Sequence, residues 1–158
     1  MNRTTKTFLS LITFLSVTAA DPSHSYAADP SKQPKPPCRI QIGKAHISSW
    51  AFANFGYRAV KVNAFSKCNV PQSKVTLTVE IWKRGKFTNT QVASTVVKSP
   101  GVTLPGRKVE NLETLRRCKT FDETKYFGVA SAKAFIQGKW QYARDTYSLE
   151  IESLKCGT

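Results

Sequence analysis

Acidic residues and histidine are scarce in this sequence. Its 158 residues contain 10 Asp and Glu against 24 Lys and Arg, a net charge of +14 at pH 7, and only two histidines. A charge of this sign favours anionic partners and says little about the fold.

Recognisable catalytic and metal-binding spacings are also missing. There is no Cys-x-x-Cys pair and only one histidine, His46, lies beyond residue 27, so we expect neither a metal site nor a cofactor. The sequence has no nucleophile-elbow motif and no glycine-rich phosphate loop. We therefore expect no catalytic residues and no enzyme. A Ser–His–Asp site built on His46, with Asp122 or Asp145, stays open as an alternative.

Long hydrophobic runs are absent after residue 20. Residues 8–20 are apolar apart from Ser and Thr, they follow Arg3 and Lys6, and residues 25–27 read Ser-Tyr-Ala. This pattern predicts a signal peptide at 1–27, a secreted product and no later membrane-spanning segment. The only Asn-x-Ser/Thr acceptor starts at Asn2, inside that segment, which together with the short basic signal indicates a bacterial source.

The remaining 131 residues suit one domain, and they keep a net charge of +13. Residues 28–37 read ADPSKQPKPP, and this Pro- and Lys-rich stretch predicts an extended linker. The domain itself is expected at 38–158.

Period-two alternation predicts an all-β domain. It is clearest at 74–83, where four branched side chains alternate with polar residues. Turn signals separate about seven such runs, which fits a two-sheet antiparallel sandwich. The expected strands are 38–47, 58–69, 74–83, 87–98, 109–119, 126–136 and 146–152, with a loop at 99–106 and a helical alternative at 110–117.

The last two runs flank Gln137-Gly138 and predict a β-hairpin. On one face of the first run, every second residue from 128 to 134 is Gly or Ala. So small a face either lets the opposing sheet approach closely or leaves room for a large side chain from that sheet. In the second run the alternation places Tyr147, Leu149 and Ile151 on a buried face.

The spacing Asp122-x-x-x-Tyr126-x-Gly128-x-Ala130 resembles strand F of immunoglobulin-like domains. The resemblance implies an immunoglobulin-like sandwich in which Tyr126 packs inward and hydrogen-bonds backbone at the preceding turn. Gly128 departs from the family, because antibody-type domains have their second core Cys there. The resemblance implies an architecture and not a function.

Four cysteines in an exported chain predict two disulfides, with three possible pairings. If the strands alternate up and down, Cys38 and Cys68 meet at one end and Cys118 and Cys156 meet at the other. We therefore expect the pairs Cys38–Cys68 and Cys118–Cys156.

Residues 48–57, SSWAFANFGY, interrupt the alternation. Ser48 or Ser49 can cap a short helix that Gly56 ends. The four aromatic residues in this segment are either an exposed platform for a sugar or partner, or a plug that closes one end of the sandwich. The sequence favours the plug.

Two basic clusters are the candidate binding residues. Basic groups beside aromatic rings bind anionic polymers through charge and stacking, although scattered cations also keep proteins soluble. The clusters are Trp82, Lys83, Arg84, Lys86 and Phe87 at a hairpin tip, and Arg116, Arg117 and Lys119 at the end of the fifth strand.

The function expected from these features is an exported, non-catalytic binding module. Its partner would be an anionic envelope polymer or an acidic protein, and not a nucleic acid. The alternatives are a small secreted enzyme or toxin, and an inhibitor of a secreted hydrolase that presents the loop at 99–106.

Overall fold

The structure is a computed structural model that describes residues 37–158 and, at Arg144, the backbone alone. The expected signal peptide at 1–27, and residues 28–36 of the expected linker, lie outside the described residues. Within 37–158 no helix is both long and apolar enough to cross a membrane.

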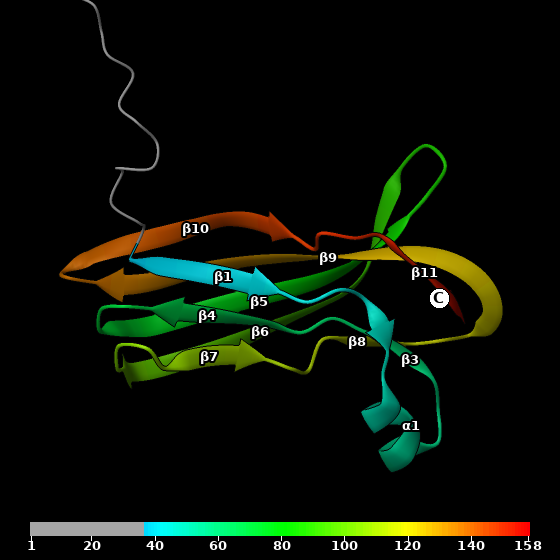
Figure 1. Cartoon of the computed structure of the whole chain (residues 1–158), viewed down its shortest axis with the longest axis horizontal. Coiled ribbons are helices and arrows are strands. Elements are labelled where there is room, and N and C mark those ends of the chain that lie inside the picture. Colours follow the sequence, from blue (N-terminus) through cyan, green and yellow to red (C-terminus); the bar gives the residue numbers. More distant parts are fainter. Residues whose placement is uncertain (1–36) are drawn as a thin grey trace, which may run out of the picture. The chain divides into compact units, whose positions relative to one another are not determined.

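The described chain is mostly β-strand, as the alternation predicted, with one short helix (Figure 1). The elements are β1 (Cys38–Ile42), β2 (His46–Ile47), α1 (Ser49–Phe55), β3 (Ala59–Lys61), β4 (Ala64–Cys68), β5 (Gln72–Arg84), β6 (Asn89–Thr103), β7 (Lys108–Asn111), β8 (Leu115–Arg117), β9 (Thr120–Ile136), β10 (Lys139–Tyr147) and β11 (Glu152–Gly157).

The strands form three antiparallel sheets. The large sheet has the order β10-β9-β5-β6, and β11 also pairs with β9. The two small sheets are β1-β4-β7 and β2-β3-β8. Because β2 follows β1, β4 follows β3 and β8 follows β7 along the chain, the small sheets are one layer interrupted at its middle.

This interruption divides three of the seven expected strands in two, and a separate break between β10 and β11 gives the eleventh strand. A buried Asn111 side chain donates from Nδ2 to the Thr95 carbonyl (2.9 Å), and its Oδ1 accepts from the Thr114 hydroxyl (3.1 Å). Such a side chain competes with ladder hydrogen bonds and turns the chain between β7 and β8. The neighbouring segment breaks at the same level, where the Val62 amide donates to the Thr114 carbonyl (3.1 Å).

The core lies between the large sheet and the small-sheet layer. Val60 and Val62 from the small-sheet side, and Leu77, Val79 and Ile81 from β5, are all fully buried in one cluster. The predicted inward face of β5 is therefore confirmed.

At Gly128 the two layers approach each other closely. A Cβ atom there would stand 2.6 Å from Val62 Cγ1 and 2.8 Å from Ile42 Cδ1. The Gly/Ala face of β9 was expected either to allow close approach of the opposing sheet or to leave room for a large side chain. At Gly128 the structure has the close approach. Tyr126 is also buried, and its hydroxyl donates to the Cys156 carbonyl on β11 (2.5 Å), whereas the resemblance implied a partner at the preceding turn.

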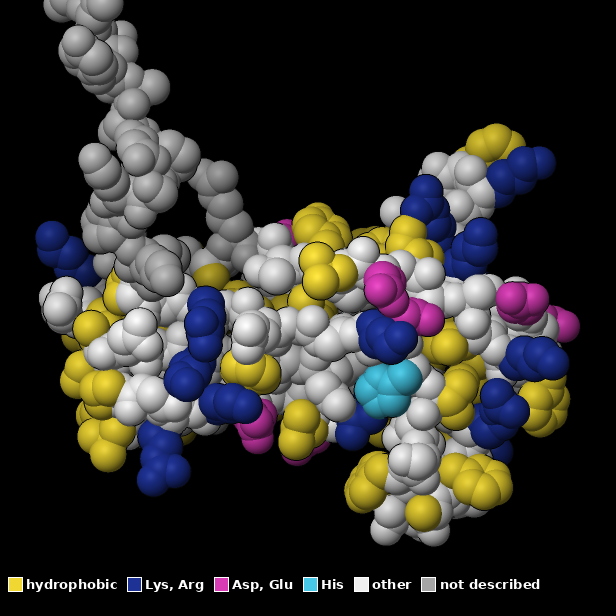
Figure 2. Space-filling view, in the orientation of Figure 1, with side chains coloured by type: hydrophobic (Ala, Val, Ile, Leu, Met, Phe, Trp, Pro, Cys, Tyr) yellow, Lys and Arg dark blue, Asp and Glu magenta, His cyan; other side chains and the backbone are white. Residues whose placement is uncertain are grey.

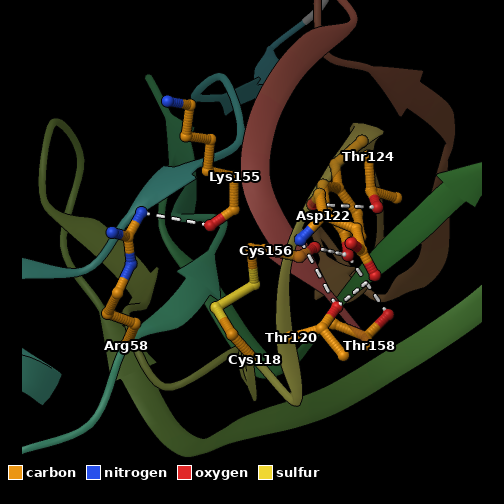
Figure 3. Close-up of a disulfide and its surroundings, with 9 residues drawn as sticks. Arg58, Cys118, Thr120, Asp122, Thr124, Lys155, Cys156 and Thr158 are labelled. Atoms are coloured by element: carbon orange, nitrogen blue, oxygen red, sulfur yellow. Dashed lines mark hydrogen bonds between the residues drawn. A yellow bond between two sulfur atoms is a disulfide. The ribbon is translucent and has the colours of Figure 1, made fainter.

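The disulfides are Cys38–Cys68 and Cys118–Cys156, as the strand directions predicted. Cys38 and Cys68 are register partners on β1 and β4, so this bond stays within one sheet. Cys118 follows β8 and Cys156 lies on β11, so the second bond joins the two layers (Figure 3). Disulfides form in oxidising compartments, and both bonds are compatible with a location outside the cytoplasm.

At 109–119 the expected strand forms as β7 and β8, and the helical alternative at 110–117 is not found. The expected loop at 99–106 was predicted wrongly, because most of it belongs to β6, which extends to Thr103 and pairs there with Gln72. Pro100 can occupy this strand because β6 is the edge of the large sheet, where a missing N–H is tolerated, and the ladder is irregular there.

Candidate functional site

The surface carries three clusters in which Lys or Arg side chains lie beside exposed aromatic rings. We call them the helix cluster (Trp50, Phe52, Phe55, Tyr57, Lys61 and Arg117), the lysine row (Lys74, Lys98 and Lys133, with Phe135 and Trp140) and the hairpin groove (Arg84, Lys86, Phe87, Tyr147, Leu149 and Ile151).

Helix α1 forms as the capping residues predicted. The Ser48 hydroxyl accepts from the Ala51 amide (3.1 Å), and Gly56 ends the helix at a φ of 69°. Ala51 is its only buried residue. The predicted plug is therefore wrong, because seven residues with one buried side chain leave the large rings outside.

Three rings of the helix cluster, those of Trp50, Phe55 and Tyr57, form a chain with a cation at each end. Trp50, Phe52 and Phe55 are 52%, 61% and 55% exposed. The Phe55 ring stacks on Tyr57 (5.6 Å) and meets Trp50 edge-on (5.1 Å). Lys61 Nζ lies 5.6 Å from the Trp50 ring and Arg117 Cζ lies 5.1 Å from the Tyr57 ring. Figure 2 shows hydrophobic side chains of α1 protruding beside basic ones.

Of the predicted residues, Arg117 belongs to this cluster, and Arg116 and Lys119 are close to it along the chain. All three are exposed, and they line a shallow hollow of about 560 Å³ at residues 115–119. Arg117 joins these basic residues to the aromatic rings, through its contact with Tyr57.

The lysine row crosses the outer face of the large sheet. Thr76 on β5 is the register partner of Lys98 on β6 and of Lys133 on β9, so the two lysines flank it on the same face. Together with Lys74 and Trp140 they line a hollow of about 280 Å³ whose lining contains no Asp or Glu.

Aromatic rings form one side of the lysine row. The Phe135 and Trp140 rings meet edge-on at 5.7 Å. Lys74 Nζ lies 5.7 Å from the Phe135 ring, and Lys133 Nζ lies 5.7 Å from the Trp140 ring. This cluster could not be predicted from the sequence, because its members come from four strands and only strand register brings them together.

Lys74 has an unusual backbone. Its φ is 51°, in the left-handed region that non-glycine residues seldom occupy. The pairing of β5 with β6 and the pairing of β5 with β9 both shift register at this point. A bulge of this kind redirects a side chain, and here it accompanies the contact of Lys74 with the Phe135 ring. Strained backbone concentrates at functional sites, which makes the lysine row a candidate binding site.

The predicted hairpin-tip cluster is divided by the structure. Trp82 faces outward on the sheet, stacks on Phe127 (6.4 Å) and donates from Nε1 to Glu80 (2.7 Å). Lys83 points to the other side, where Nζ donates to the Thr158 carbonyl (3.5 Å). Only Arg84, Lys86 and Phe87 remain together at the tip, where they line the hairpin groove.

The other wall of the hairpin groove was predicted wrongly as buried strand. Tyr147, Leu149 and Ile151 are exposed, and Ser148 is buried instead. The cause is a register shift between Ala143 and Thr146, after which the chain leaves β10 at Tyr147 and rejoins β9 only at Glu152. Alternation along the sequence carries no signal of such a shift.

Most cations of the described surface have no acidic partner. Among the described side chains, ion pairs form only at Lys44, with Glu152 (3.1 Å) and Glu150 (3.8 Å). The hydrogen bond to Lys44 holds the pKa of Glu152 below its ordinary value, and the same bond raises the pKa of Lys44. The remaining positive charge is available to an external anion.

The residues of the alternative catalytic site have separate partners. His46 Nδ1 lies 3.1 Å from the Lys44 carbonyl, and Asp122 accepts from the Thr120 hydroxyl (2.7 Å). Asp145 lies on β10, and no hydrogen bond or ion pair joins it to His46 in the described part of the chain. In residues 37–158 no cluster of three His, Cys, Asp or Glu side chains could hold a metal ion.

Comparison of the chain with models of known protein families and with curated protein sequences finds no match.

Proposed function

We propose that this chain is an exported, basic, non-catalytic module that binds an anionic polymer of the cell envelope. The observation that supports this most directly is the lysine row, in which three ammonium groups and an exposed Trp ring line one hollow without a carboxylate.

The arrangement favours an anion for a simple electrostatic reason. Adjacent strands are about 4.8 Å apart, so Lys98 and Lys133, on either side of Thr76, have Cα atoms roughly 10 Å apart on one face. Their like charges repel, and an anionic group between them relieves the repulsion. A sugar ring can stack on Trp140 beside them, while Thr76 and Ser99 offer hydroxyl groups.

A polymer can engage more than one cluster. The helix cluster offers a second set of rings with Lys61 and Arg117 beside them. When one site holds the polymer, the effective concentration of the polymer at the second site rises. Two individually weak sites can therefore bind the polymer tightly together.

We also propose that the domain is an immunoglobulin-like sandwich. The pairs β1–β2, β3–β4, β7–β8 and β10–β11 can each be counted as one segment, which gives seven segments along the chain. Segments 1, 2 and 5 then form one layer, and the other layer has the order 7, 6, 3, 4. Immunoglobulin domains pair their strands in a related way, with the fourth segment joining the sheet of the third in variable-type domains. This order supports the proposal.

Salt-gradient elution from an immobilised sulfated glycan tests the function, with a neutral glycan column as control. The whole protein is expected to bind the sulfated column at low salt and to elute as salt screens the contacts. Failure to bind even at low salt would overturn the proposed function.

A matched pair of variants tests the site. K98Q/K133Q removes two charges of the lysine row, and K125Q/K155Q removes two exposed charges elsewhere. We expect K98Q/K133Q to elute at clearly lower salt than K125Q/K155Q. Equal elution of the two variants would show that net charge alone causes retention, and would remove the lysine row from the proposal.

A further inference from the structure

The hairpin groove gathers four large exposed side chains, Phe87, Tyr147, Leu149 and Ile151, at one place. It is a hollow of about 550 Å³ between the β5–β6 tip and the chain that joins β10 to β11. Phe87 on the first wall is 90% exposed, and Leu149 on the second is fully exposed. Tyr147 and Ile151 are exposed beside Leu149. Soluble proteins seldom gather large apolar side chains at one place without a partner for them.

The structure holds these side chains outward. Ser148 is buried, its amide donates to the Gly128 carbonyl (2.9 Å), and its hydroxyl accepts from the Gly128 amide (3.0 Å). The same hydroxyl donates to the Glu150 carbonyl (3.1 Å), so the backbone on both sides of Leu149 is fixed.

The opposite wall is also constrained. A Cβ atom at Gly85 would stand 2.1 Å from the Thr88 carbonyl oxygen, so the tip closes too tightly for a side chain there. This tight turn projects Phe87 away from the sheet, and Figure 2 shows the hairpin standing clear of the body with hydrophobic and basic side chains at its end.

Charge at the groove has one sign. Arg84 and Lys86 line it, and its lining includes no Asp or Glu among the residues that the structure describes. Near the second wall in sequence, Glu150 and Glu152 pair with Lys44 (3.8 and 3.1 Å), and Asp145 does not line the groove. On β5, Glu80 accepts from Trp82. An occupant of this groove must therefore present apolar groups together with negative charge.

We propose that the hairpin groove is a docking surface for an anionic lipid bilayer. Phe87 and Leu149, at the ends of two separate loops, enter the acyl region, while Arg84 and Lys86 lie at the level of the lipid phosphates. Tyr147 lies at the polar boundary, where aromatic residues with a polar end are enriched. This surface is independent of the lysine row, so it adds a membrane contact to the polymer binding proposed above.

Vesicle co-sedimentation of the whole protein tests this inference. The probes are phosphatidylcholine vesicles containing phosphatidylglycerol and vesicles of phosphatidylcholine alone. We expect binding to the first kind, weaker binding to the second, and a loss of about fivefold for K86Q on the anionic vesicles, since one basic residue near such a surface contributes about 1 kcal/mol.

The deciding comparison uses apolar side chains. F87S/L149S removes both inserted groups and is expected to lower the partition coefficient at least about tenfold. V102S/L104S removes two exposed apolar side chains from the other end of the same β5–β6 hairpin region and is expected to leave it unchanged. Both variants are first compared with the parent protein by thermal unfolding, since exposed positions should leave the fold intact.

Three outcomes would overturn the inference. Equal binding by F87S/L149S and the parent protein would show that charge alone attracts the vesicles. An absence of vesicle binding by the parent protein would exclude a bilayer, and concentration-dependent dimers that F87S/L149S abolishes would assign the groove to a second copy. The proposed polymer binding is tested separately, because F87S/L149S should elute from the sulfated column with the parent protein.

Discussion

The substitution Gly128→Ala tests the close approach of the two layers directly. The new Cβ would stand 2.6 Å from Val62 Cγ1 and 2.8 Å from Ile42 Cδ1, whereas carbon atoms in contact are normally about 3.5–4.0 Å apart. Val62 is fully buried and cannot swing into solvent. Inserting a methyl group into such a core costs about 1–3 kcal/mol, which outweighs the gain of about 0.5–1 kcal/mol from replacing a strand glycine.

Urea unfolding with both disulfides intact measures the effect. The net loss is then roughly 0.5–2 kcal/mol. With a slope of about 2 kcal/mol per molar urea, the midpoint of Gly128→Ala should fall by about 0.25–1 M. Gly101→Ala is the control, because no heavy atom lies within 4 Å of the Cβ position there. We expect its midpoint to stay or to rise slightly.

A second substitution tests whether Val62 is the cause. Val62→Ala alone should destabilise the protein through the lost burial. Combined with Gly128→Ala it should cost less than the sum of the two single changes by roughly 1 kcal/mol, because the missing methyl groups make room for the new one. Strict additivity, or a Gly128→Ala midpoint equal to that of Gly101→Ala, would refute the close approach.

Three further predictions concern other parts of the fold. Replacing Cys118 and Cys156 by Ala should lower the free energy of unfolding by about 4 kcal/mol, as expected for a bond that spans 38 residues, and a loss below about 1 kcal/mol in urea unfolding would contradict this. Ser48→Ala should lower the free energy of unfolding by about 1 kcal/mol through the lost helix cap, with Ser49→Ala nearly neutral, as measured by thermal unfolding. The pKa of Glu152 lies below its ordinary value near 4.5, so the stability from its bond to Lys44 is present above that pH and is lost as the pH falls further. The melting temperature of Glu152→Gln, followed by circular dichroism, should therefore fall less over this acid range than that of the parent protein; parallel curves would count against the pair.

Much of the fold follows from short-range patterns in the sequence. Four side chains that alternate along β5 are buried as expected. The predicted turn at Gln137-Gly138 forms with φ values of 48° and 78°, the positive values that a two-residue hairpin turn of this type requires. Strand direction was sufficient to choose the disulfide pairs, because each cysteine lies near the end of a strand.

The errors have a common physical cause. Tyr147, Leu149 and Ile151 alternate like the residues of a strand. The residue of this segment that hydrogen-bonds to β9, however, is Ser148, through Gly128. This pairing depends on register rather than on local sequence. The lysine row was missed for the same reason. The aromatic side chains of α1 were assigned to a plug because large rings are usually buried, whereas the helix is too short to bury more than Ala51.

The distribution of tryptophan has a practical consequence. The chain has three, and they are divided among the three surfaces: Trp50 in the helix cluster, Trp140 beside the lysine row, and Trp82 stacked on Phe127, which lines the hairpin groove. Each surface therefore carries its own intrinsic fluorophore. In three variants, each retaining one tryptophan with the other two replaced by Phe, the emission of the remaining tryptophan reports whether a glycan or a vesicle covers that surface. No attached dye is needed.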